Sequence, residues 1–396
     1  MHDPLRRHVF ALLTVLAVIV GASAEAQPAL NLPDGLAPRL IERLEQEIEK
    51  QGLVGLSAGV VMDGKVAGTL HFGHEDRENG IASSRDTMYR WASISKPLTA
   101  IVAMLAAEDG RLDLDADIRT YVPEFPEKPW TITARQLLTH QGGVVHYSNG
   151  PVIRTRREYD VANPYKDTIL SLDTFKESPL VCEPGTKHSY TTHGYMLLAA
   201  VVERATNTPY AELVRKRIAR PLGMSTLRPD YQWEDIPHRA VGYRTNRQGE
   251  AVQSTNTDVS WKLGGGGWIS SVEDLARLAA GLMDDSIVPA PVRERMWTRQ
   301  RTRDGAETGY GLGFTVGVLD GMRLVGHSGS QEKTRTNMLL CPELGAAIVL
   351  MSNSEHAELG ALTRDLLRAV VEATKAARDE SQDTGTGDKQ PLKQEA

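Results

Sequence analysis

The sequence predicts an α+β fold in which one antiparallel sheet, flanked by helices, carries an inserted helical lobe. Strand-like patterns occur in two blocks, at residues 56–73 and 310–353, and the residues between them, 93–300, are mostly helical in pattern. The first block follows a predicted helix and the last block precedes one. We therefore expect both ends of the chain to meet in a single sheet.

The N-terminal elements are a helix and a hairpin. The helix is predicted over residues 37–52, where Gly52 is a stop signal. Its apolar face consists of Leu40, Ile41, Leu44 and Ile48. In the following run, LSAGVVMDGKVAGTLHFG, Asp63-Gly64 separates two β-prone halves. This pattern is typical of a β-hairpin with a two-residue turn.

The C-terminal elements are three short strands and a helix. The strands are expected within residues 310–353, and the helix over about 358–377. Residues 378–396 have no apolar periodicity, which predicts a disordered tail. We expect a single folded domain over residues 36–377.

Composition and charge exclude several classes of protein. The 396 residues are 41% hydrophobic, enough for a large core, and the formal net charge of −6 is spread along the chain without a basic face for nucleic acid. Two cysteines, Cys182 and Cys341, are too few for a disulfide framework, and we expect both to be buried. Four histidines lack the spacing of a metal site and are interpreted as surface or loop residues: His140, His146, His188 and His193. We expect neither a metal nor a cofactor.

Residues 1–26 have the organisation of a secretory signal peptide. Arg6 and Arg7 precede an apolar run from Val9 to Val20, and small residues follow it. The run is shorter than the roughly 20 residues that a spanning helix needs, so an uncleaved anchor is the weaker alternative. We expect an exported protein, periplasmic or secreted, with no stable membrane span after cleavage; the oligomeric state is left open.

The sequence contains two S-x-x-K patterns. Ser330 and Lys333 lie before a strand-like run, whereas Ser93 and Lys96 begin an apolar helix pattern. One helical turn brings the Lys96 amine beside the Ser93 hydroxyl, and a partly desolvated lysine can hold the proton of a nucleophile. The alternative is that Ser93 only caps the helix.

Two further motifs carry groups suited to acyl transfer. Tyr190 stands just before the strongly apolar helix pattern that follows, where its phenol can exchange protons. The stretch VGHSGSQ, residues 325–331, ends a predicted strand, and its glycines permit close approach of a ligand to the backbone. Taken alone, Tyr190 is better explained by packing, and His327 by a structural or incidental role.

Taken together, these motifs resemble the serine β-lactamase and penicillin-binding protein superfamily in its class C-like branch. The likeness covers about residues 36–375. It also includes ARQLLTHQGG at 134–143, KLGGGGWISSVEDLARLA at 262–279 and YGLGFTV at 310–316.

The resemblance implies a site in the cleft between sheet and helical lobe. Ser93 would be the acylated nucleophile, Lys96 its proton partner and Tyr190 the base. The resemblance also implies an oxyanion hole and a set of substrate-binding residues: the backbone N–H groups of Ser93 and Ser330 for the former, and Thr192, His327, Ser328 and Gly329 for the latter.

Two positions depart from the pattern of the family's lactamases. Thr192 stands where they carry the asparagine of Y-x-N, and it offers no amide to a substrate. His327 replaces the lysine of K-T-G, which removes a positive charge that would attract a substrate carboxylate; Lys333 or Arg335 is a candidate substitute. Both departures resemble esterases and peptidases of the superfamily, and the run YTTHGYMLLAAVVER is especially similar to the mitochondrial β-lactamase-like serine proteases.

We therefore predict an exported serine hydrolase acting on a small molecule or peptide that contains an ester, amide or peptide bond. A D-alanyl carboxypeptidase or a weak class C-like β-lactamase is the alternative among enzymes. A non-catalytic binder of a cell-wall or peptide ligand is the alternative outside them. The presence of Ser93, Lys96 and Tyr190 argues against a binder.

Overall fold

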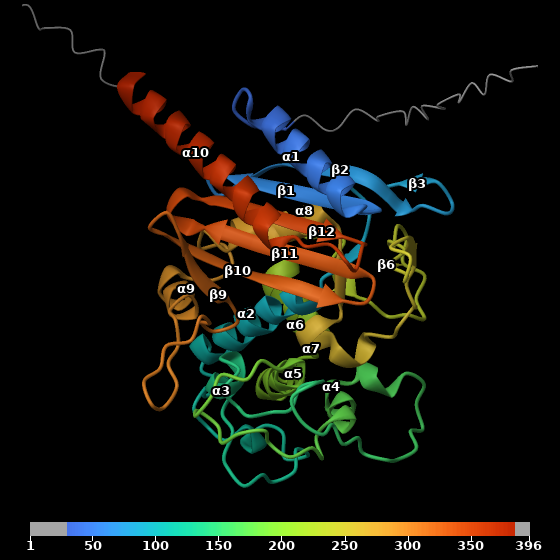
Figure 1. Ribbon diagram of the computed structural model, residues 1–396. Coiled ribbons are helices and arrows are strands. Elements are labelled where there is room, and N and C mark those ends of the chain that lie inside the picture. The colour runs from blue at the N-terminus through green and yellow to red at the C-terminus, as the bar shows by residue number, and fades with distance from the viewer. Residues whose placement is uncertain (1–29, 385–396) are drawn as a thin grey trace, which may run out of the picture.

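The computed structural model describes residues 30–384 and contains a seven-stranded antiparallel sheet with helices on both faces (Figure 1). The strand order is β3-β2-β1-β12-β11-β10-β9. The strands are β1 (Gly55–Met62), β2 (Lys65–Asp76), β3 (Ile81–Ala82), β9 (Thr315–Leu319), β10 (Met322–Gln331), β11 (Thr334–Cys341) and β12 (Ala346–Ser352). Because β1 pairs with β12, the two ends of the chain meet at the centre of the sheet. The predicted fold class is confirmed, with four C-terminal strands in place of three.

The sheet separates two apolar clusters. On one face, α1 (Leu36–Gln51) and α10 (Gly360–Thr384) cover the strands, and on the other face α8 (Val272–Gly281) packs against β1, β2 and β12 (Figure 1). In β12, Ile348 and Leu350 join the first cluster, while Val349 and Met351 join the second. Because both faces are covered, the strand reads as a continuous apolar run.

The turn between β1 and β2 has the geometry that its sequence predicts. Asp63 and Gly64 both have positive φ angles, 47° and 71°. This is the backbone that a two-residue hairpin turn needs in order to match the twist of its strands, and Asp-Gly adopts it with little strain. The hairpin prediction is confirmed.

The chain ends differ in part from expectation. Helix α1 ends before Gly52, whose φ is 62°, as predicted. Helix α10 continues to Thr384, so residues 378–384, which we expected to be disordered, are helical. The predicted signal peptide, 1–26, and residues 385–396 lie outside the described part of the chain. Among the described helices, none has the length and apolar character needed to cross a membrane.

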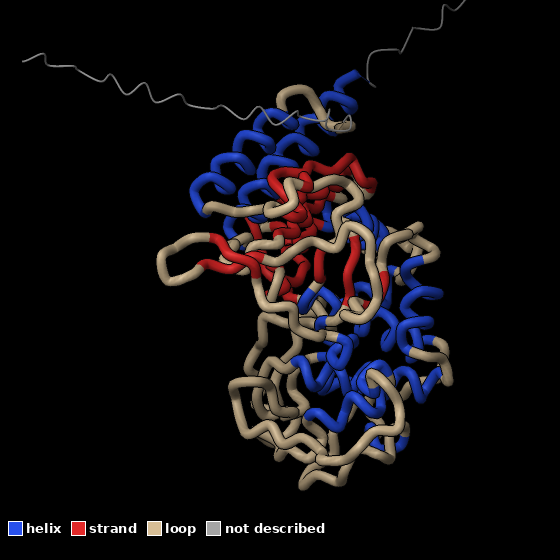
Figure 2. Tube along the Cα trace, turned by 90° about the vertical axis from the view of Figure 1, so that its right-hand side faces the viewer, coloured by secondary structure: helices blue, strands red, loops and turns tan. Residues whose placement is uncertain are grey.

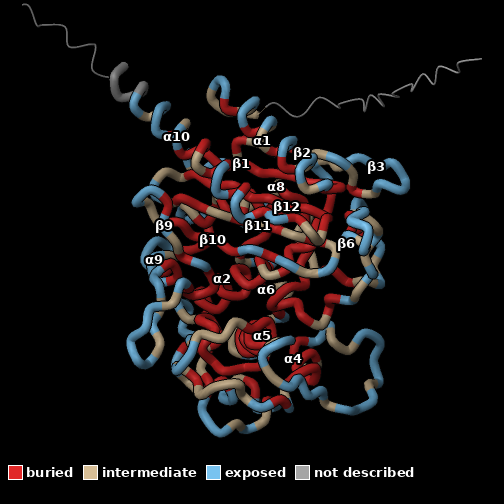
Figure 3. Tube along the Cα trace, in the orientation of Figure 1, coloured by how far each residue is buried: buried red, intermediate tan, exposed pale blue. Residues whose placement is uncertain are grey.

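The inserted lobe is less helical than its pattern predicts. Its helices are α2 (Ser95–Glu108), α3 (Ala134–Leu138), α4 (Thr168–Ser171), α5 (Thr192–Thr206), α6 (Tyr210–Val214), α7 (Leu263–Gly266) and α9 (Ala290–Met296). Two small sheets also form, β4 (Tyr89–Arg90) with β8 (Trp268–Ser270) and β5 (Arg228–Pro229), and β6 (Tyr243–Thr245) with β7 (Ala251–Gln253). Long loops occupy much of the lobe (Figure 2), because glycine, proline and asparagine interrupt the apolar periodicity. Helix α5 lies buried among the other helices (Figure 3).

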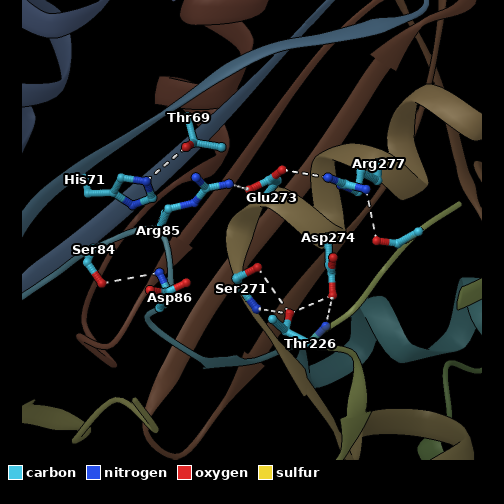
Figure 4. Close-up of polar contacts among 11 residues, drawn as sticks. Thr69, His71, Ser84, Arg85, Asp86, Thr226, Ser271, Glu273, Asp274 and Arg277 are labelled. Carbon is cyan, nitrogen blue, oxygen red and sulfur yellow. Dashed lines mark hydrogen bonds and ion pairs between the residues drawn. The ribbon is translucent and has the colours of Figure 1, made fainter. Parts of the chain in front are cut away.

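Polar contacts fasten the start of α8 to neighbouring segments (Figure 4). The Asp274 carboxylate accepts hydrogen bonds from the backbone N–H groups of Thr226 at 2.7 Å and Leu227 at 2.8 Å. Glu273 pairs with both Arg85 and Arg277, each at 2.8 Å. Since α8 lies against the sheet, these contacts join the sheet to the segment that precedes β5.

The cysteines remain unpaired. Cys341 is buried, whereas Cys182 is half-buried, and both are free thiols. The expectation that both are buried is therefore wrong for Cys182.

Candidate active site

Ser93 lies in a tight turn, Ala92–Ile94, that leads directly into α2. Ala92 has a φ of 49°, a left-handed conformation that residues with a Cβ rarely adopt. The residue preceding α2 is Ile94, and no side chain caps that helix. The alternative that Ser93 is a helix cap is therefore wrong, and the turn instead places Ser93 on the wall of a cavity.

Lys96 is fully buried behind Ser93. Its Nζ donates to the Ser93 Oγ at 2.9 Å, to the backbone oxygen of Gly265 at 2.9 Å and to the Thr192 Oγ1 at 3.3 Å. Burial, assisted by the positive charge of Lys262, holds the pKa of Lys96 well below its usual range. A neutral amine has two N–H groups and one lone pair, so it can turn the lone pair toward Ser93, reverse that hydrogen bond and accept the proton of the hydroxyl.

Tyr190 stands at the mouth of α5, as predicted. Its ring centroid lies 4.7 Å from the Lys96 Nζ. Burial raises the pKa of the phenol, and a hydrogen bond with the Ser93 side chain opposes part of that rise. The phenol is therefore protonated at neutral pH. Thr191 positions it by capping α5, since the Thr191 hydroxyl accepts a hydrogen bond from the Gly194 N–H at 3.2 Å.

The glycine run before β8 lets α7 approach α5 closely. A Cβ on Gly264 would lie 2.6 Å from the Ala199 Cβ, and one on Gly265 would lie 2.7 Å from the Thr192 Cγ2. The close packing brings the Gly265 carbonyl to Lys96. The interpretation of this run as backbone packed near the cleft is confirmed.

The end of β10 forms the opposite wall. β9 pairs with β10 only as far as Gly326, so the edge of β10 beyond that point is not covered by β9. Ser328 and Ser330 both line the cavity. An oxyanion hole from the backbone N–H groups of Ser93 and Ser330 remains a prediction; the two residues line the same cavity.

Gly329 permits β10 to approach the turn that holds Ser93. A Cβ at this position would lie 2.4 Å from the Trp91 carbonyl oxygen, 3.0 Å from the Ala92 Cβ and 2.1 Å from the Thr336 Oγ1. Any side chain would push the strand away from the turn. Gly329 itself is not a cavity-lining residue, and its contribution here is close packing.

His327 lies behind the cavity. Its Nε2 forms a hydrogen bond with the Tyr310 hydroxyl at 3.0 Å, and its Nδ1 approaches the Ser328 carbonyl at 2.6 Å. Burial lowers the pKa of His327 to about 3, so the ring is neutral. Contact between His327 and a substrate stays a prediction, and it requires these two hydrogen bonds to rearrange.

Two histidines that we expected in loops or on the surface are buried beside this site. His140 accepts a hydrogen bond from the Thr191 N–H at 3.2 Å, and its ring centroid is 4.3 Å from that of Tyr190. His193 stacks on Phe175 with ring centroids 4.6 Å apart. His140 does lie in a turn, whereas His193 belongs to α5, and the surface interpretation is wrong for both because both are buried. Spacing along the chain could not place them, because their partners come from distant segments.

A family model described as Beta-lactamase matches residues 40–372. The chain belongs to this family. It is 29% identical over 306 residues to the human serine beta-lactamase-like protein LACTB, mitochondrial, a match that covers 62% of this chain and 55% of that protein. The chain thus spans about half the length of this curated relative.

Further relatives of this β-lactamase-family chain include an enzyme and a solved structure. Esterase EstB of Burkholderia gladioli is 28% identical over 374 residues, covering 85% of this chain and 95% of that protein. The octameric penicillin-binding protein homologue from Pyrococcus abyssi has a TM-score of 0.71 at 24% identity, covering 85% of this chain and 77% of that chain. The chain is a member of a β-lactamase-fold family of serine hydrolases.

The cavity of this β-lactamase-family protein has a volume of about 700 Å³. Five of the eight residues to which the resemblance assigns a role line it: Ser93, Tyr190, Thr192, Ser328 and Ser330. The other lining residues are His146, Tyr147, Trp261, Lys262, Gly265, Gly266, Gln331, Glu332, Arg335 and Glu355. Of the two cations considered as substitutes for the missing lysine, Arg335 lines the cavity, whereas Lys333 donates to Asn256 at 3.1 Å.

Proposed function

We propose that the protein is an exported serine hydrolase that forms an acyl-enzyme on Ser93 and hydrolyses an ester, amide or peptide. The observation that carries this proposal is the buried Lys96 amine, 2.9 Å from the Ser93 Oγ, with its pKa held well below the usual range. A serine hydroxyl is a weak nucleophile unless an adjacent base accepts its proton. Export rests on the sequence of residues 1–26.

In the proposed first step, the Ser93 Oγ attacks the substrate carbonyl and its proton passes to Lys96. The backbone N–H groups of Ser93 and Ser330 would stabilise the oxyanion that forms. Tyr190 then donates its phenolic proton to the leaving group and regains a proton from Lys96. Water attacks the Ser93 ester in the second step and releases the acid.

The directions in which the pKa values of Lys96 and Tyr190 are shifted indicate which residue accepts a proton and which donates one. The resemblance implies that Tyr190 is the base, but burial raises its pKa and lowers that of Lys96. At neutral pH the amine is therefore the better proton acceptor and the phenol the better donor. We assign the base to Lys96 and the proton donor to Tyr190.

An ester is the first substrate class to examine. The relative named Esterase EstB is matched over 95% of its own length and 85% of this chain. In addition, neutral His327 stands in place of the K-T-G lysine that would attract a substrate carboxylate. A D-alanyl carboxypeptidase or weak β-lactamase is the second candidate, because curated relatives include a putative penicillin-binding protein of Bacillus subtilis, 26% identical over 292 residues.

The proposal is tested by intact-protein mass spectrometry and hydrolysis in the same tubes. We expect the wild type to hydrolyse 4-nitrophenyl butyrate and Ser93→Ala to be inactive while keeping its circular dichroism spectrum. Incubation with a penicillin tests the second candidate: a Ser93-dependent mass adduct or loss of the β-lactam would favour it. Equal ester hydrolysis by wild type and Ser93→Ala would refute the role of Ser93.

A further inference from the structure

Lys262 places a cation on the wall of the catalytic cavity. The residue precedes α7 and is only 7% exposed. Its Cδ and Cε lie 3.6 and 3.7 Å from the point where a Cβ on Gly266 would be, and both residues line the cavity. Within residues 30–384, no hydrogen bond or ion pair engages the Lys262 amine, which rests 5.6 Å from the Trp261 ring centroid. Lys262 lines the cavity and its amine has no protein anion within ion-pair distance, so a ligand anion would supply its partner.

An aromatic wall adjoins this lysine. The rings of Tyr147 and Trp261 both line the cavity and lie 6.1 Å apart in an edge-on arrangement. His193 stands behind them, with its centroid 5.3 Å from Tyr147 and 6.0 Å from Trp261. Aromatic rings beside the Lys262 amine suit a ligand whose body is planar or apolar and whose nearby end is negatively charged.

The second cation of the cavity is engaged elsewhere. The Arg335 guanidinium donates to the carbonyl oxygens of Gln331 at 2.9 Å and Thr334 at 2.8 Å. The carboxylates of Glu332 and Glu355 also act on it. Arg335 is therefore already provided with acceptors and counter-charges by the protein.

Two carboxylates lie near Lys262 without forming an ion pair with it. Glu332 and Asp258 both act on Lys262 through space, but neither forms an ion pair with it. A further cation, the exposed Arg154, acts on the same His193 ring as Lys262 does. Because neither carboxylate comes within ion-pair distance of the Lys262 amine, an anionic group of a ligand in the cavity could form the close contact that they do not.

We propose that Lys262 is a specificity-determining residue that anchors a substrate carboxylate, and that this hydrolase prefers substrates with an apolar body ending in that anion. Lys262 lies on the wall formed by the helical lobe, beside α7. It does not belong to the K-T-G position on β10, where His327 stands. The inference rests on the proposed function, since it names the substrate class of the same site.

Binding measured without turnover tests the anchor. In the Ser93→Ala background, 3-phenylpropionate and the matched neutral 3-phenylpropionamide are titrated by calorimetry. Because a hydrogen bond to a charged group strengthens binding appreciably, we expect the carboxylate to bind about tenfold more tightly than the amide. Adding Lys262→Met should reduce this ratio to about one. Lys333→Met is the matched control, because Lys333 does not line the cavity, and it should leave the ratio intact.

A kinetic arm separates this inference from the proposed function. Wild type and Lys262→Met are compared on mono-4-nitrophenyl glutarate and on 4-nitrophenyl butyrate, and we expect the ratio of the two kcat/KM values to fall about tenfold in the variant. A binding ratio near one in the Ser93→Ala protein, or one that Lys262→Met leaves unchanged, overturns the anchor. Hydrolysis that does not depend on Ser93, beside a Lys262-dependent binding ratio, overturns the proposed function and supports the anchor.

Discussion

Replacing Lys96 with methionine separates its chemical role from its effect on stability. Methionine has a similar length and no charge, so it fills the space of the buried lysine stem. It cannot accept the Ser93 proton, and loss of a general base typically slows a reaction by about 10²- to 10⁴-fold. We expect kcat/KM for 4-nitrophenyl butyrate to fall within or beyond that range.

The effect on stability depends on pH in a defined direction. The pKa of Lys96 is far below 10.5 in the folded state and close to about 10.4 in the unfolded chain. Between these values the unfolded state binds more protons, so the free energy of unfolding of the wild type rises with pH, by up to about 1.4 kcal/mol per unit. Methionine lacks this titration. The stability of Lys96→Met relative to wild type should therefore be greatest near neutral pH and decline as the pH approaches 10.4.

A second effect of Lys96→Met on the free energy of unfolding does not depend on pH. Lys96→Met leaves the Gly265 carbonyl without its donor at 2.9 Å, which lowers the free energy of unfolding by about 1–3 kcal/mol at every pH. The informative quantity is thus how the difference in unfolding free energy between Lys96→Met and wild type changes with pH. Lys262 and Lys333 also titrate, but they are present in both proteins and largely cancel.

The assay is urea unfolding of both proteins at pH 7, 8, 9 and 10, followed by tryptophan fluorescence. A stability difference that does not change with pH would refute the reasoning that Lys96 is held neutral by burial. Activity of Lys96→Met within tenfold of wild type would remove Lys96 as the base. A thermal melt at pH 7 checks that the variant is folded before its activity is interpreted.

Three further substitutions test other parts of the site and its frame. Tyr190→Phe should slow ester hydrolysis by about 10²- to 10⁴-fold with little change in KM, and an unchanged kcat would reduce Tyr190 to packing. Gly329→Ala places a methyl group within 2.4 Å of a backbone oxygen, so it should lower kcat and destabilise the fold by about 1–3 kcal/mol. Gly309→Ala is the control, because a methyl group there meets nothing within 4 Å. Equal effects of the two substitutions would contradict the close-packing argument. Asp230→Ala leaves the buried Arg90 without its carboxylate and should lower the free energy of unfolding by about 3–5 kcal/mol in urea, and a change below about 1 kcal/mol would show that the pair is solvated.

Local patterns predicted those parts of the molecule whose geometry depends on near neighbours. The apolar face that includes Leu40 and Leu44 predicts α1, and Asp63-Gly64 predicts the hairpin turn with its two positive φ angles. The S-x-x-K spacing likewise anticipates the Lys96–Ser93 contact, because one helical turn brings the two side chains together.

The same kinds of pattern gave wrong predictions where the structure depends on contacts between segments that are far apart in the chain. The lobe that looks helical contains long loops and two small sheets, since glycine, proline and asparagine interrupt its apolar periodicity. His140 and His193 resemble loop histidines in sequence but are buried against Tyr190 and Phe175. Nothing in their immediate context signals those neighbours.

By itself, the sequence determined the α+β architecture, the family resemblance and the identities of Ser93, Lys96 and Tyr190 as candidates for the chemistry. Tertiary structure alone decided which groups those candidates meet. Burial holds the pKa of the Lys96 amine well below its usual range and raises that of the Tyr190 phenol, and Lys96 meets Thr192 of α5 and Gly265 of α7. Of the two cations that line the cavity, Arg335 is hydrogen-bonded to the protein, whereas no hydrogen bond or ion pair engages the Lys262 amine within residues 30–384. Lys262 lies outside the K-T-G position that the sequence analysis considered, because packing brings residues together in space and not along the chain.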